Sequence, residues 1–180
     1  MTVSRLDPAH LLDAAQDLAD LLADTVDGGS SVGFLAPLDR AAAVAWWTQR
    51  AETVAAGRLA VWVARGERGR VLGTVSLALP DKPNSGHRAE LVKLMVCRAA
   101  RGRGLGRALL ATAEEAAAAR GITLLHLDTE TGSPAERLYR SAGWTPVGSI
   151  PDYAADPTGV LRPTTIYYKR LAAGGTPAAG

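Results

Sequence analysis

The chain has 180 residues, which is enough for one domain with a sizeable hydrophobic core. Its 20 basic and 18 acidic side chains give a formal net charge of +2, which argues against a general nucleic-acid or membrane-surface binder. No apolar run approaches the roughly 20 residues of a membrane span, and the single cysteine, Cys97, excludes an internal disulfide and favours the cytoplasm.

The first half of the sequence predicts a strand, two helices and a hairpin. Residues 2–6 form a strand-like segment, and Pro8 then begins an amphipathic helix with one apolar side. That side consists of Leu11, Ala15, Leu18 and Leu22. Asp39 is placed to cap a second helix over about 40–56. Two strand-like segments joined as a hairpin complete this half, at 59–65 and 71–79.

A long glycine- and serine-rich segment, residues 24–39, predicts a loop between the two helices. Loops of this length inside a compact domain are commonly functional. A second loop is predicted over 80–88. Together with the loop at 24–39, it would shape any substrate pocket.

The second half alternates strands with helices. Its predicted strands are 89–96, 123–130, 145–150 and 164–171. Its predicted helices are 104–120 and a short helix that begins after the cap Ser133 and ends near Gly143. This pattern predicts an α/β domain with a mixed sheet and helices on both faces. We expect the domain to span 1–172 and residues 173–180 to form a disordered tail.

An arginine- and glycine-rich loop joins the strand 89–96 to the helix that follows. It contains Arg98, Arg101, Arg103 and Arg107 together with Gly102, Gly104 and Gly106. Helix N-termini expose unpaired N–H groups that bind anions, glycines let the backbone approach a ligand, and guanidinium groups bind phosphate. The loop lacks the Gly-Lys-Ser/Thr ending of a P-loop, and its glycines run GxGxG rather than GxGxxG. It therefore predicts a polyanion site of another kind.

Two segments resemble the GNAT superfamily of acyl-CoA-dependent N-acetyltransferases. The sequence Arg101-Gly102-x-Gly104-x-Gly106 is similar to the family's pyrophosphate loop. The segment 135–144, with the pattern A-x-x-L-Y-x-x-x-G-W, is similar to a second family motif. The chain departs from the family at Arg98, where proline is common, and at Gly132, where asparagine is common.

The resemblance implies a GNAT-type fold, with a mixed, mainly antiparallel sheet that is splayed between its fourth and fifth strands. It also implies acetyl-CoA as co-substrate, without a metal. The residues expected to bind it are Leu94, Met95, Val96, Arg101, Gly102, Arg103, Gly104, Leu105, Gly106, Arg107, Ser133, Ala135, Leu138 and Arg140.

Carboxylates in apolar strands need a partner or a water-filled cleft. Regular alternation places Glu90, Val92 and Leu94 on one side of their strand and Leu91, Lys93 and Met95 on the other. In the resembled enzymes the residues matching Glu90, Asp128 and Tyr139 are catalytic candidates. Either carboxylate would take the amine proton while the other orients the ammonium, and Tyr139 would donate to the sulfur. A backbone N–H near Met95 or Val96 would hold the carbonyl oxygen.

Five further segments, outside and inside the cofactor motifs, resemble the tabtoxin resistance acetyltransferases of that family, which act on a β-lactam-containing amino-acid toxin. They are TVDGGSSVGF, HRAELVKLMV, ARGRGLGR, LLHLDTE and RPTTIYYK. The resemblance implies a small-molecule amine substrate and a cytoplasmic resistance enzyme. Residues expected to contact the acceptor are Gly33, Phe34, Trp46 and Trp47, with one of the two tryptophans packed in the core.

Each of these residues also has a purely structural interpretation. Glu90 could pair only with Arg88 or Lys93, Asp128 could cap the turn into Ser133, and His126 fits a core histidine. Cys97 is expected to pack, and the three histidines and one cysteine give no metal spacing. The alternatives left open are another acceptor (a polyamine, an amino acid or a protein lysine), a non-catalytic acyl-CoA sensor, and a homodimer. A nucleic-acid or membrane partner is not expected.

Overall fold

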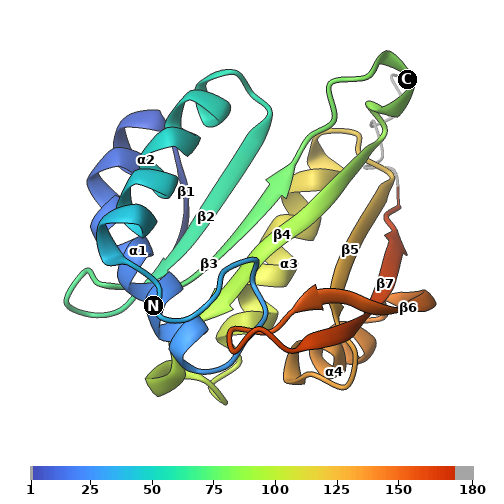
Figure 1. Ribbon diagram of the computed structural model, residues 1–180. Coiled ribbons are helices and arrows are strands. Elements are labelled where there is room, and N and C mark those ends of the chain that lie inside the picture. Colours follow the sequence, from blue (N-terminus) through green and yellow to red (C-terminus); the bar gives the residue numbers. More distant parts are fainter. Residues whose placement is uncertain (1, 173–180) are drawn as a thin grey trace.

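A seven-stranded sheet organises residues 2–172, which are those described in a computed structural model of the chain (Figure 1). The strands are β1 (Thr2–Leu6), β2 (Leu59–Arg65), β3 (Val71–Ala78), β4 (Arg88–Val96), β5 (Leu124–Glu130), β6 (Thr145–Ala155) and β7 (Leu161–Arg170). Their spatial order is β1-β2-β3-β4-β5-β7-β6, and only the β4–β5 pair is parallel. The predicted mixed, mainly antiparallel sheet is confirmed. The predicted tail at 173–180 lies outside the described residues.

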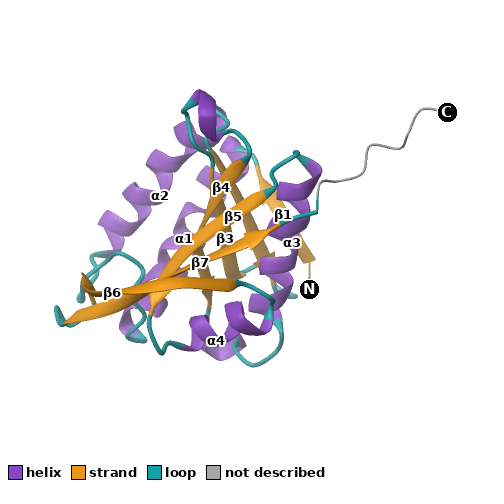
Figure 2. Ribbon diagram, turned by 90° about the vertical axis from the view of Figure 1, so that its right-hand side faces the viewer, coloured by secondary structure: helices purple, strands orange, loops and turns teal. Residues whose placement is uncertain are grey.

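In the described part of the chain, four α-helices cover the two faces of the sheet (Figure 2). They are α1 (Pro8–Asp27), α2 (Arg40–Ala55), α3 (Leu105–Ala119) and α4 (Pro134–Ser141). Residues of α1 and α2 share one apolar core with Val61 and Val63 of β2. Residues of α3 and α4 share a second core with Ala60 and Trp62, which point to the opposite face. Within residues 2–172, none of the helices combines the length and apolar character needed to cross a membrane.

Side-chain caps explain where three of these helices begin. Asp7 accepts a hydrogen bond from the N–H of His10 at 2.8 Å, and Asp39 accepts one from the N–H of Ala42 at 3.0 Å. Ser133 caps α4 in the predicted way. The prediction of a loop over 24–39 was wrong at its start, because the buried stripe of α1 continues through Val26 and the helix ends at Asp27.

The loop over 28–39 lies against the tip of the β6–β7 hairpin (Figure 1). The N–H of Ala36 donates to the carbonyl oxygen of Pro157 at 2.8 Å. The hairpin tip is itself held by Asp156, which accepts hydrogen bonds from the N–H groups of Thr158 and Val160. The loop and the hairpin tip, which are far apart in the sequence, thus lie side by side.

The parallel pairing of β4 and β5 is short. It runs only from Arg88 opposite Leu124 to Glu90 opposite His126, and beyond this point the two strands diverge (Figure 1). Because strand edges carry N–H and C=O groups that need partners, the part of β4 after Glu90 offers them toward β5 without a strand to receive them. The splay expected between the fourth and fifth strands is confirmed.

A β-bulge interrupts β4 in this region. Val92 lies opposite Ser76 and Met95 opposite Thr74, so two residues of β4 face one residue of β3. Lys93, inside the bulge, has a φ of +54°. The predicted regular alternation was therefore wrong: Leu91 packs in the α3-side core, whereas Met95 packs in the α1-side core. Because of the extra residue, side chains after the bulge point to the face opposite to the one that regular alternation predicts.

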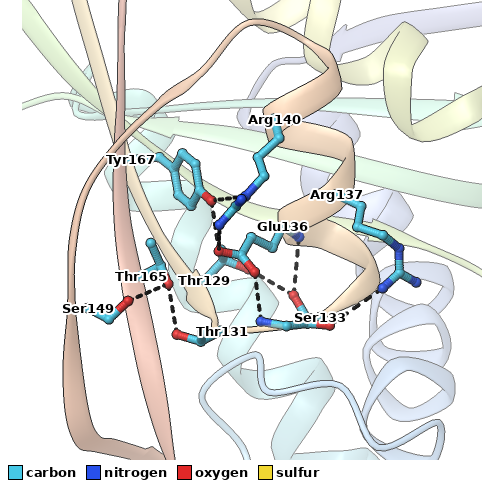
Figure 3. Close-up of polar contacts among 10 residues, drawn as sticks. Thr129, Thr131, Ser133, Glu136, Arg137, Arg140, Ser149, Thr165 and Tyr167 are labelled. Carbon is cyan, nitrogen blue, oxygen red and sulfur yellow. Dashed lines mark hydrogen bonds and ion pairs between the residues drawn. The ribbon is translucent and has the colours of Figure 1, made fainter.

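A buried carboxylate fastens α4 to β7 (Figure 3). Glu136 accepts hydrogen bonds from the Tyr167 hydroxyl at 2.7 Å, from Arg140 at 3.1 Å and from the N–H of Gly132 at 2.7 Å. Despite burial, which raises it, these contacts lower the pKa of Glu136 from 4.5 to about 2. The network fixes the height and rotation of α4, which also carries Tyr139.

Replacing Glu136 by glutamine is expected to lower the free energy of unfolding at pH 7 by ~2 kcal/mol, because charge-assisted hydrogen bonds are lost. Since the folded state lowers the pKa of this carboxyl to about 2, its stabilisation is complete above 4.5 and is lost as the pH falls toward 2. Urea unfolding at several pH values should show the difference between wild type and variant shrinking below pH ~4.5. The exposed Glu115→Gln on α3 is the control, and an equal loss in both variants would contradict this role.

Candidate active site

The N-terminus of α3 has exposed backbone donors. The first N–H groups of a helix have no intrahelical partner. Among the α-helices of residues 2–172, α3 is the one whose first turn has no side-chain cap. Its N-cap residue is Gly104, and no acidic residue lies in its first turn. The helix dipole adds partial positive charge at this position, so the first turn is suited to an anion.

Two glycines of the loop are required by its geometry. Gly104 has a φ of +78°, a left-handed conformation that favours glycine. A Cβ on Gly106 would lie 3.2 Å from the Leu138 side chain and 3.8 Å from that of Val96. The absence of a side chain at Gly106 thus lets α3 pack closely against α4 and the end of β4. The predicted loop residues and the predicted α4 residues meet at this contact.

The four arginines of the loop do not form a single cluster of free charges. Arg98 binds Asp24 at the end of α1, with its Nε and Oδ1 2.8 Å apart. Arg101 donates to the carbonyl oxygen of Val96 at 3.0 Å, and Arg107 donates to the Ser141 hydroxyl at 2.6 Å. Among the contacts of residues 2–172, none engages the guanidinium of Arg103. Backbone amides are therefore the main donors of the loop.

The other residues expected to bind the cofactor divide between surface and core. Leu94, Val96, Ala135 and Leu138 are partly buried against the α3-side core, at β4 and α4. Met95 is buried on the opposite face. The side chains of Ser133 and Arg140 are occupied within the protein, by the cap of α4 and by the Glu136 network.

Tyr139 projects from α4 into the α3-side core and is 6% exposed. Its ring lies 5.8 Å from that of Trp144 and 6.4 Å from that of Tyr167. Burial, with a smaller contribution from the negative charge of Asp128, raises the pKa of the Tyr139 phenol well above its ordinary value. The hydroxyl therefore stays protonated, as a hydrogen-bond donor, over the whole physiological range.

Glu90, His126 and Asp128 share the face of the sheet opposite to α3. This follows because their chain neighbours, Ala89 and Leu91 on β4 and Leu125 and Leu127 on β5, pack in the α3-side core. Glu90 lies opposite His126 in the last β4–β5 pair, and Asp128 lies two residues further on, where the strands diverge. His126 is only half-buried and lies 3.2 Å from Arg88, so the expectation of a core histidine was wrong. No ion pair of Glu90 or Asp128 occurs within the described part of the chain.

Lys93 is a residue of this site that sequence reasoning missed. Its Nζ lies 5.4 Å from the centroid of the Trp46 ring and 5.9 Å from that of Phe34. Burial lowers the pKa of Lys93, and the charge of Arg50 lowers it further, whereas Asp128 and Glu90 act in the opposite direction. A lysine flanked by Val92 and Leu94 in a strand was the available signal.

The two tryptophans of α2 have separate positions. Trp46 is half-buried and meets Phe34 edge to face, with the ring centroids 5.5 Å apart. Trp47 is fully buried in the α1-side core. Of the residues expected at the acceptor, the structure thus brings Gly33, Phe34 and Trp46 to Lys93 but keeps Trp47 away.

Metal ligands do not gather at this site: across residues 2–172 no group of three or more His, Cys, Asp or Glu side chains could hold a metal ion. The arrangement instead combines an anion-binding helix end, an open strand edge, two carboxylates and a protonated phenol. Such a set can bind a phosphorylated carrier and move a proton near the strand edge.

Comparison with known proteins agrees with this arrangement. Residues 26–144 match the sequence model of the acetyltransferase (GNAT) family. The fold is similar to that of a ribosomal-protein-alanine N-acetyltransferase from Brucella melitensis, with 25% identity, a TM-score of 0.74 and coverage of 95% of this chain and 100% of that one.

Two further solved structures share the fold. One is a GNAT superfamily phosphinothricin acetyltransferase from Sinorhizobium meliloti in complex with acetyl-CoA, with 21% identity, a TM-score of 0.79 and coverage of 100% of this chain and 95% of that one. The other is an N-acetyltransferase from Staphylococcus aureus, with 20% identity, a TM-score of 0.76 and coverage of 96% and 100%.

Proposed function

The chain belongs to the acetyltransferase (GNAT) family, and from this premise we propose that it transfers an acetyl group from acetyl-CoA to the primary amine of a small molecule. The observation that carries the proposal is the uncapped N-terminus of α3 directly beside the divergence of β4 and β5. A diphosphate would fit the N-terminus of α3, and an extended thioester arm would fit between the diverging strands β4 and β5. The two carboxylates lie on the face of the sheet that this arm would reach.

The residues of the loop would bind the diphosphate through main-chain N–H groups of Leu105, Gly106 and Arg107, with Arg103 adding charge. The arm would then run along β4 and complete its open edge. A backbone N–H near Met95 or Val96 would hold the carbonyl oxygen of the thioester as negative charge develops on it. Acetyl-CoA supplies the activated acetyl group, and the chain supplies position and proton transfer.

Asp128 is our candidate for the group that takes the proton from the acceptor ammonium, directly or through one water. It lies on β5 two residues beyond the last β4–β5 pair, and its charge raises the pKa of both Lys93 and Tyr139. Glu90 would hold the ammonium before transfer. Tyr139 would donate a hydrogen bond to the departing sulfur while the new N–C bond forms and the C–S bond breaks.

For the acceptor we propose an amino-acid-like antibiotic or toxin, which would make the protein a resistance enzyme. The support is the resemblance of several segments to tabtoxin resistance acetyltransferases and the fold likeness to a phosphinothricin acetyltransferase. The α-amino group of a peptide has a pKa near 7.7–8.0, and the free carboxylate of an amino acid raises the pKa of its amine above this range. Such an acceptor is therefore mostly an ammonium at pH 7, so a general base is needed.

The direct test is release of free coenzyme A thiol from acetyl-CoA in the presence of a panel of amines, followed by mass spectrometry of the amine that reacts. The panel contains phosphinothricin, the standard amino acids, spermidine and a lysine peptide. We expect amine-dependent thiol release with a mass increase of about 42 Da, one acetyl group, on an amino acid. No release with any amine, although acetyl-CoA binds, would instead indicate a non-catalytic sensor.

Substitution of the carboxylates should separate their roles. We expect Asp128→Asn to lower kcat/KM for the amine by about 10³-fold and Glu90→Gln by about 10-fold, because general-base catalysis contributes ~10²–10⁴. The loss in Asp128→Asn should diminish as the pH rises and the amine deprotonates in solution. Equal and pH-independent effects of both substitutions would contradict this assignment.

A further inference from the structure

Two cations meet at one aromatic side chain on the acceptor side of β4. The Lys93 ammonium lies 5.4 Å from the centroid of the Trp46 ring, and the Arg50 guanidinium lies 4.3 Å from the same centroid. Arg50 and Trp46 are one helical turn apart on α2, so their contact is fixed locally. Lys93 belongs to β4, and the bulge in that strand turns its side chain toward α2. The two charges therefore converge from different elements.

Neither cation has a carboxylate partner. None of the ion pairs formed within residues 2–172 includes Lys93 or Arg50. Like charges that approach each other in a partly buried place repel, and desolvation adds to the cost. Both effects lower the pKa of Lys93. An anion within reach of both groups would offset this cost, so the pair is suited to attract one.

The Lys93 ammonium lies beside a residue without a side chain, Gly33. A Cβ on Gly33 would lie 3.7 Å from Nζ, so a side chain at this position would contact the ammonium. Phe34 and Trp46 cover two other sides. An anion here would be attracted by the ammonium and not by the ring faces, which carry partial negative charge.

Two carboxylates, Glu90 on β4 and Asp128 on β5, share with Lys93 the face of the sheet away from α3. Asp128 and Glu90 both raise the pKa of Lys93 without forming an ion pair with it. The second cation thus belongs to α2, whereas the two carboxylates belong to β4 and β5. A molecule with an ammonium at one end and a carboxylate at the other would complement both.

We propose that Lys93 and Arg50 form a carboxylate-binding subsite, so that the acceptor is a zwitterion with a free carboxylate close to its reactive amine. The subsite deepens the proposed acetyl transfer and rests on it. A polyamine lacks this carboxylate and would bring a further cation toward Lys93 and Arg50, so the subsite selects against it.

The test compares each standard α-amino acid with its own α-carboxamide, which keeps the side chain and the amine but lacks the carboxylate. Binding is measured by calorimetry in the presence of saturating coenzyme A, and transfer is measured by thiol release. Removal of the carboxylate lowers the pKa of the amine and makes it the more available nucleophile. A preference for the free acid therefore cannot arise from amine reactivity.

We expect the best amino acid to bind at least about 10-fold more tightly than its carboxamide, a difference of ~1.4 kcal/mol. In Lys93→Met, which keeps the aliphatic stem among the rings, this preference should vanish and KM for the free acid should rise at least about 10-fold. Arg50→Met should lower the preference in the same direction. The control Arg68→Met, in the exposed β2–β3 turn, removes one positive charge elsewhere.

A carboxamide that binds and reacts as well as the free acid in wild type would overturn the proposal. So would a Lys93→Met variant that loses activity equally toward both members of the pair. If no amine is acetylated, the proposed function fails, and the calorimetric comparison still decides on the subsite.

Discussion

Replacing Gly104 by aspartate is expected to raise the Kd for acetyl-CoA by about 30-fold, whereas Gly104→Asn should raise it less than about 5-fold. Both substitutions impose the same left-handed strain at a φ of +78°, and asparagine and aspartate are the residues that tolerate it best after glycine. They differ in charge. A carboxylate beside the uncapped first turn of α3 would repel the diphosphate by ~2 kcal/mol.

Calorimetry with both variants, together with thermal unfolding, checks this prediction. A carboxylate near a helix N-terminus favours the helix, so Gly104→Asp should be at least as stable as Gly104→Asn. Loss of affinity without loss of stability would therefore locate the diphosphate at this helix end. If both variants bind acetyl-CoA with the same Kd, the diphosphate does not bind at the first turn of α3.

Replacing Tyr139 by phenylalanine is expected to lower kcat by about 100-fold, the scale on which loss of one well-placed donor reduces a reaction rate. The Kd for acetyl-CoA should stay within about 2-fold of wild type, because the ring and its contacts with Trp144 and Tyr167 remain. The Tyr139 hydroxyl would stabilise the negative charge that develops on sulfur in the transition state, so its loss should affect kcat and not the binding of acetyl-CoA.

The pH profile gives a second measure of Tyr139. Because burial and Asp128 raise the pKa of its phenol, the phenol should not deprotonate below pH ~10, and kcat should show no alkaline decline from this group. The exposed Tyr153→Phe on β6 is the matched control. A Tyr139→Phe enzyme with near-wild-type kcat would contradict the proposed donation to sulfur.

Local signals in the sequence were sufficient for the starts of the helices and for the arginine-rich loop, although not for the end of α1. Asp39 and Ser133 cap the helices they were expected to cap, and Gly104 begins α3 at the end of the arginine-rich loop. These features depend on residues close together in the chain, which is why spacing alone predicts them. The mixed sheet followed from the alternation of elements, and its splay followed from the resemblance.

Features that depend on pairing between distant segments were not predictable. The bulge at Lys93 exists because β3 and β4 fall out of register by one residue, and no residue within β4 signals it. The missed bulge led to the wrong orientation of Met95 and hid the approach of Lys93 to α2. The partners of Arg98 and Arg107, Asp24 and Ser141, likewise lie more than thirty residues away in the sequence.

Titration of acetyl-CoA and of S-acetylpantetheine into the wild-type protein is the most direct test of the central claim, which is that the α3 N-terminus binds the diphosphate of a thioester carrier. The two ligands share the thioester and the arm, and only the first has the diphosphate. The account predicts saturable binding of acetyl-CoA at one site, at least about 100-fold tighter than that of S-acetylpantetheine. No binding of acetyl-CoA by folded protein, or equal affinity for both ligands, would contradict it.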